Sequence, residues 1–132
     1  MAESAVHRTM KEIVRTELAS EDYRVVEEPL GPPARWISWS TYRPDLLGFR
    51  IDSGTEELVI VECETHPNMR RFRSKHFSSL SFQSSMFRQG SIRRILAVPQ
   101  GKLGSVDLGL RRGWEVWILG RRKTLEKMSR LD

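Results

Sequence analysis

The chain has 132 residues, of which 39% are hydrophobic and 30% charged, and a formal net charge of +5. This composition is typical of one folded domain spanning residues 1–132 and excludes a largely disordered chain. No apolar run approaches the roughly 18 residues of a membrane span, no signal peptide is visible, and the single cysteine, Cys63, excludes an internal disulfide and a cysteine-rich zinc site. We therefore expect a cytoplasmic protein with no membrane partner.

Charge is distributed unevenly along the chain. Residues 1–66 carry 7 Lys and Arg against 13 Asp and Glu, a net −6, whereas residues 67–132 carry 15 against 4, a net +11. A basic half beside an acidic half suits a protein that binds a polyanion with one surface and contacts it with carboxylates from another. A solvated basic surface explains the same asymmetry, so charge alone leaves both interpretations open.

The first half of the chain is predicted to form one helix and then strands. A 3.6-residue period predicts a helix over residues 5–18, with apolar positions at Val6, Met10, Ile13, Val14 and Leu18. Strand-like segments begin at Tyr23 and then cover residues 36–42, 43–52 and 57–65.

The second half predicts further alternation of helix and strand. A helix runs from Pro67 to about Gln89 and is followed by a strand at 93–100, a short helix at 105–113, a strand at 114–120 and a C-terminal helix at 121–131. This order favours an α/β fold in which a mixed central β-sheet is flanked by helices.

Both long helices are predicted to turn polar side chains toward the sheet. At 100° per residue, Glu17 falls inside the apolar stripe of the first helix, whereas Glu12 falls outside it. His76 and Gln83 fall inside the stripe of the second helix. Buried polar groups need partners, so these faces either meet a polar site or satisfy the side chains with backbone hydrogen bonds.

The segment ELVIVECETH (57–66) ends a core strand with two glutamates. Side chains alternate along a strand, so Glu62 and Glu64 leave one face about 7 Å apart and Cys63 points to the other. Asp45 begins the preceding strand. Mg²⁺ or Mn²⁺ would suit Asp45 and Glu62, with Glu64 as a further ligand or as the general base for an attacking water. Alternatively, the glutamates form ion pairs with Arg70, Arg71 or Arg73.

An inward glutamate on the first helix, then Pro44–Asp45, then a strand ending in VECE resembles the PD-(D/E)xK nucleases. These enzymes have the restriction-endonuclease-like fold and include Holliday junction resolvases. The resemblance covers about residues 6–100 and implies that Asp45 and Glu62 bind a divalent metal, with Glu17 assisting. The segment QSSMF, with Gln83 and Phe87, is similar to the QxxxY pattern of one branch of the family.

The chain departs from this family at Glu64, which occupies the position of the usual lysine. Some restriction enzymes of this fold have glutamate there and remain active, and others recruit a cation from the next helix, where Lys75 stands in a suitable position. The same departure also fits a degenerate nuclease that binds nucleic acid without cleaving it.

The basic half of the chain, residues 67–132, is expected to bind the nucleic acid. Phosphate contacts give affinity without sequence information, and the cations at the start of the second helix are Arg70, Arg71, Arg73 and Lys75. No base-reading motif is evident, so we expect structure-selective or non-specific binding, with DNA favoured over RNA. Three functions remain open: a metal-dependent endonuclease, a degenerate binding or assembly subunit, and an unrelated interaction module. A homodimer is suggested only by analogy with resolvases.

Overall fold

The computed structural model describes residues 5–27, 45–64, 91–101, 106–107, 110 and 113–129. The elements in this part of the chain are α1 (Ala5–Ser20), β1 (Arg24–Glu27), β2 (Leu46–Asp52), β3 (Thr55–Cys63), β4 (Ser91–Pro99), β5 (Glu115–Leu119), the 3₁₀ turn η3 (Arg121–Lys123) and β6 (Leu125–Met128). No helix within the described residues has the length and apolarity to cross a membrane.

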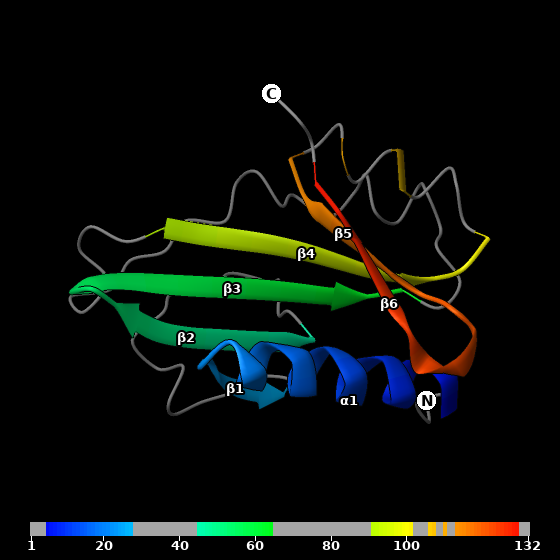
Figure 1. Ribbon diagram of the computed structural model, residues 1–132, viewed down its shortest axis with the longest axis horizontal. Coiled ribbons are helices and arrows are strands. Elements are labelled where there is room, and N and C mark those ends of the chain that lie inside the picture. Colours follow the sequence, from blue (N-terminus) through cyan, green and yellow to red (C-terminus); the bar gives the residue numbers. More distant parts are fainter. Residues whose placement is uncertain are drawn as a thin grey trace.

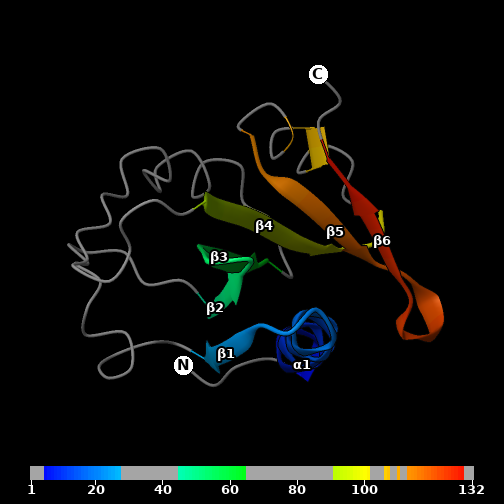
Figure 2. The same cartoon turned by 60° about the vertical axis from the view of Figure 1, so that its left-hand side comes forward.

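The six strands form one mixed sheet in the order β1-β2-β3-β4-β5-β6. β3, β4 and β5 run parallel, whereas β1, β2 and β6 are antiparallel to their neighbours. Helix α1 lies against one face of this sheet (Figures 1 and 2). The predicted α/β class with a mixed sheet is therefore confirmed. The predicted strand at 36–42 and the predicted helix from Pro67 to Gln89 lie outside the described residues.

Helix α1 contacts the sheet through one row of apolar side chains. Met10, Val14 and Leu18 are buried at the 3.6-residue spacing, and each buried side chain of this kind contributes about 1.5–3 kcal/mol. They pack on the sheet residues Val59, Val61, Cys63, Ile95, Ala97 and Trp117. The contact row is rotated from the predicted stripe, because Lys11 is buried while Val6 is 52% exposed.

The two faces of β3 follow strand alternation. Val59, Val61 and Cys63 belong to the core beneath α1, so Leu58, Ile60 and Glu62 point to the opposite face. All of these side chains are buried. The prediction that Cys63 is a small buried hydrophobe is confirmed.

The hairpin between β2 and β3 turns where the sequence DSGT predicts it. Ser53 and Gly54 both have left-handed φ angles, 52° and 82°, as a type I′ turn requires. This turn places the start of β2 beside the end of β3, with Leu46 opposite Val61. Asp45 is thereby brought next to the C-terminal end of β3.

The predicted C-terminal helix over residues 121–131 is wrong. Arg121–Lys123 form a 3₁₀ turn, and Leu125–Met128 form strand β6. β6 pairs with β5 through Leu119 and Leu125 at the hairpin end and through Val116 and Met128 at the other. The short helix predicted at 105–113 agrees with the helical backbone of Val106, Asp107 and Leu110.

A polar network joins the far end of the sheet to the end of α1. Glu57 Oε2 accepts hydrogen bonds from Arg50 Nε at 2.8 Å and from the Tyr23 hydroxyl at 2.9 Å. The Arg50 guanidinium also lies 4.4 Å from the centre of the Tyr23 ring. The hydrogen bonds from Arg50 and then from Tyr23 lower the pKa of Glu57.

This lowered pKa makes stability depend on pH. Glu57 stabilises the fold above its unfolded pKa of about 4.3, and that contribution is lost as pH falls through the lower folded value. We expect Glu57→Gln to lower the free energy of unfolding by about 1 kcal/mol at neutral pH, since the pair is partly solvated. The deficit should shrink in urea titrations below about pH 4, whereas Glu126→Gln, on the exposed face of β6, should change nothing. A deficit that is the same at every pH would contradict this role.

Candidate functional site

The candidate site lies at the C-terminal end of β3, where β2 begins. The backbone N–H of Asp45 donates to Val61 O at 3.0 Å, and Asp45 Oδ2 accepts a hydrogen bond from Cys63 N at 2.8 Å. These two contacts fix both the backbone and the carboxylate of Asp45 against the end of β3. The next residue along this end, Glu62, is only 2% exposed. Asp45 and Glu62 therefore both lie at this end of the sheet, which we call the Asp45 edge.

Helix α1 contributes His7 to this edge. His7 Nε2 donates to Cys63 O at 3.0 Å and lies 3.6 Å from Asp45 Oδ2. The imidazole therefore contacts the backbone of β3 and the side chain of Asp45 together. Protonated, it would place a positive charge beside that carboxylate.

Lys11, one helical turn beyond His7, is also directed at the sheet. The residue is 2% exposed, and its Nζ lies 2.5 Å from Glu27 Oε1 at the end of β1. A buried ammonium group is retained only where carboxylates or other acceptors surround it. Lys11 thus places a fixed positive charge between α1 and the sheet.

Cys63 is surrounded by these charges. Burial raises the pKa of its thiol well above the ordinary value, and the negative charges of Asp45, Glu62 and Glu64 raise it further, whereas Lys11 opposes them. The three carboxylates and the Lys11 ammonium group therefore all act on the Cys63 thiol. These four charged groups lie around the same end of β3. The thiol stays protonated at neutral pH, so it is not an active nucleophile.

Glu64 is the first residue beyond β3. Its backbone N–H donates to Ala97 O on β4 at 2.9 Å, which continues the β3–β4 pairing past Cys63. The residue is half-buried and makes side-chain or electrostatic contacts of its own.

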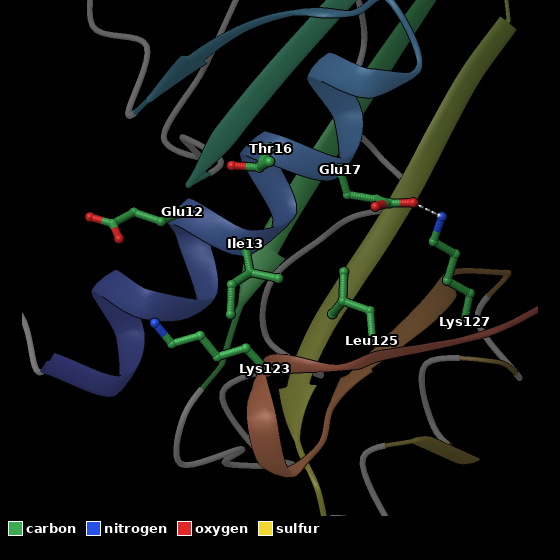
Figure 3. Close-up of a pocket in the computed structure, with 7 residues that line it drawn as sticks. All are labelled: Glu12, Ile13, Thr16, Glu17, Lys123, Leu125 and Lys127. Atoms are coloured by element: carbon green, nitrogen blue, oxygen red, sulfur yellow. Dashed lines mark hydrogen bonds and ion pairs between the residues drawn. The ribbon is translucent and has the colours of Figure 1, made fainter.

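Helix α1 does not bring Glu17 to this edge. Glu17 is half-exposed, and its Oε1 lies 2.5 Å from Lys127 Nζ on β6 (Figure 3). Glu12 is exposed, as predicted. The structure does not describe the other predicted site residues, which are Arg70, Arg71, Arg73, Lys75 and Gln83.

Sequence reasoning did not single out His7 and Lys11, although a signal was present. Counted from Val6, His7 falls at 100°, inside the predicted apolar stripe, and Lys11 falls at about 140°, at its flank. A histidine and a lysine one turn apart beside the stripe point to a helix face that meets carboxylates. A search of that helix face for basic as well as acidic side chains identifies His7 and Lys11.

Metal binding by this edge remains a prediction. Among the residues that the structure describes, no three His, Cys, Asp or Glu side chains gather closely enough to hold a metal ion. Mg²⁺ needs only one or two carboxylates when water and substrate phosphate complete its shell. Asp45 and Glu62 offer that hard-oxygen donor pair, so the residues present fit such an ion chemically.

A hollow lies between α1 and the β5–β6 hairpin (Figure 3). Its volume is about 650 Å³, and its lining is formed by Glu12, Ile13, Thr16, Glu17, Lys123, Leu125 and Lys127. It shares no residue with the Asp45 edge.

Comparison with known proteins shows the fold and little more. No family model matches the chain, and no curated protein matches it by sequence. Among solved structures, an FdxN element excision controlling factor protein from Anabaena variabilis matches with a TM-score of 0.51 at 13% identity, over 92% of this chain and 99% of that one. An XisH family protein from Nostoc punctiforme matches over the same shares at 13% identity, with a TM-score of 0.49. At this identity, the first match shows a shared fold and says nothing about activity.

Proposed function

We propose that the protein is a metal-dependent endonuclease that hydrolyses phosphodiester bonds of DNA at the Asp45 edge. The observation that carries this proposal is the carboxylate of Asp45, fixed by Cys63 N beside the buried Glu62 at the shared end of two neighbouring strands. Carboxylates held this firmly at a strand end suit a hard cation and a phosphate.

Each residue has a separate part in the proposed reaction. Asp45 and Glu62 would hold Mg²⁺ or Mn²⁺, and a bound ion would supply Lewis-acid chemistry for the phosphate and the attacking water. Glu64 is a further ligand or accepts the proton of the attacking water. Lys11 would lessen the repulsion between the carboxylates before substrate binds, and His7 would add to this effect when protonated.

The remaining predicted residues serve binding and support. Arg70, Arg71, Arg73 and Lys75 contact the phosphates of the bound strand, and Lys75 also serves as the candidate for the missing lysine. Gln83 is proposed to support the site, whereas Glu17, which pairs with Lys127 on β6, has no part in it.

A second function is favoured by one specific observation. Lys11 forms an ion pair with Glu27, and His7 lies 3.6 Å from Asp45 Oδ2, so helix α1 supplies basic side chains at this end of the sheet without a metal. Together with glutamate at position 64, this arrangement supports a degenerate relative that binds nucleic acid without cleaving it.

Incubation with DNA separates the two functions. The purified protein is mixed with duplex, single-stranded, flap and four-way-junction DNA in Mg²⁺, Mn²⁺, Ca²⁺ or EDTA. We expect cleavage in Mg²⁺ or Mn²⁺ and none in EDTA, together with a rise in melting temperature at millimolar Mn²⁺. No cleavage of any substrate and no rise in melting temperature would move the assignment to the binding-only function.

A further inference from the structure

The tip of the β5–β6 hairpin carries a concentrated positive charge. Residues 121–123 are Arg121, Arg122 and Lys123, and all three are exposed. Within the part of the chain that the structure describes, no carboxylate forms an ion pair with any of them. Their charges are therefore available to a partner.

This tip stands at the same edge of the sheet as Asp45 and Glu62. β3, β4 and β5 are parallel, with Cys63 opposite Ala97 and Pro99 opposite Leu119, so their C-terminal ends share one edge. The loop follows Leu119 directly. In Figure 1 the orange hairpin tip lies at the same end of the molecule as the arrowhead of β3 and the start of α1. Ligands of parallel sheets bind beyond this edge.

The backbone of the tip is held in a strained conformation. Arg122 has φ 62° and ψ 27°, and Lys123 has φ 59°. This left-handed region is costly for residues other than Gly, Asn and Asp. Two successive left-handed residues suit a tight hairpin turn, and the chain places two long cations there in place of the Gly, Asn or Asp that such turns favour.

Hydrogen bonds fix the strained loop in one shape. Gly120 N donates to Thr124 O at 2.9 Å, and Thr124 Oγ1 donates to Arg121 O at 3.0 Å. A Cβ at Gly120 would lie 2.9 Å from Thr124 Oγ1, so a larger residue would displace the Thr124 side chain that closes the loop. Because the loop is preorganised, a partner that binds its cations has little loop entropy to remove.

We infer that Arg121, Arg122 and Lys123 form a phosphate-binding tip that holds the DNA backbone across the edge occupied by Asp45 and Glu62. A polyanion such as DNA suits this tip, because three adjacent cations on one loop can contact more than one phosphate. This inference rests on the proposed function for its partner and adds a binding element outside the predicted Arg70–Lys75 segment.

The test measures binding rather than cleavage. Anisotropy of fluorescein-labelled duplex DNA is titrated at several salt concentrations in EDTA. The double variant Arg121→Glu/Arg122→Glu should lose at least about tenfold in affinity near 100 mM salt and reduce the slope of log K against log salt by about 2. The matched control, Arg24→Glu, changes an exposed arginine on β1, which is the outer strand on the other side of the sheet from β6, and should leave the slope unchanged.

Arg122→Gly separates function from fold. Glycine accepts the left-handed φ without cost, so the melting temperature should rise or stay constant while the salt slope falls by about 1. Unchanged affinity and slope in Arg122→Gly and in the double variant would overturn the inference, even if metal-dependent cleavage is observed. Binding that depends on these arginines in a protein without cleavage would uphold the inference and remove the nuclease function. Binding to anionic lipid vesicles but not to DNA would overturn it as well.

Discussion

Asp45→Asn and Glu62→Gln each reduce Mg²⁺- or Mn²⁺-dependent DNA cleavage by about a thousandfold or more, because loss of a metal ligand removes several kcal/mol of transition-state stabilisation. The amide introduced by Asp45→Asn still offers an oxygen to Cys63 N, so the contact that fixes the start of β2 persists. The amide introduced by Glu62→Gln keeps the volume of the buried Glu62 side chain. Both variants should therefore remain folded, with circular dichroism spectra like that of the unmodified protein.

Two further measurements make this prediction specific to the site. The rise in melting temperature with Mn²⁺ should vanish in both variants. Asp52→Asn, which changes an exposed carboxylate at the other end of β2, should retain cleavage and the Mn²⁺ response. Cleavage that persists in both site variants would refute metal binding by Asp45 and Glu62.

The sheet could be predicted from sequence because its strands are apolar runs of the expected length. Segments 43–52, 57–65, 93–100 and 114–120 correspond to β2, β3, β4 and β5, with ends that differ by a few residues. The placement of Asp45 at the same end of the sheet as Glu62 followed from the same pattern, because the DSGT turn sets the start of one strand beside the end of the next.

The C-terminal segment could not be predicted from local pattern. Leu125 and Met128 are three residues apart, which suits one face of a helix, whereas in a strand this spacing puts the two side chains on opposite faces. Long-range contacts decide between the two: Lys127 Nζ lies 4.6 Å from the centre of the Trp117 ring and also binds Glu17. Pairing with β5 therefore overrides local helix propensity.

The face that α1 turns toward the sheet could not be predicted from the local sequence pattern either. The period of the apolar residues fixes the buried face only to within about one residue step of 100°. In the structure Met10, Val14 and Leu18 define the contact row, which turns Lys11 inward and leaves Glu17 at the rim, bound to Lys127. The question of which charged side chain of α1 faces the carboxylates is thus settled by tertiary packing.

Substitution of Glu64 is expected to have the second large effect on the cleavage rate. If Glu64 binds metal or accepts a proton from water, Glu64→Gln should lower the cleavage rate about 10²- to 10⁴-fold while keeping volume and hydrogen bonding. Glu64→Lys should preserve or raise activity if a cation at this position is what the site lacks. Both variants keep the backbone hydrogen bond from residue 64 to Ala97 O, so a change in rate reports on the side chain.

The same substitutions distinguish a degenerate relative. If the protein has lost catalysis, Glu64→Gln should raise the melting temperature, because it relieves repulsion with Glu62 that no metal offsets. Glu126→Gln, on the exposed face of β6, is the matched control and should leave both rate and melting temperature unchanged. Single-turnover cleavage and thermal melts with and without Mn²⁺ measure the two effects in one preparation. A cleaving protein whose rate is unchanged by Glu64→Gln would exclude Glu64 from the chemistry and leave Asp45 and Glu62 as the acidic residues that carry it.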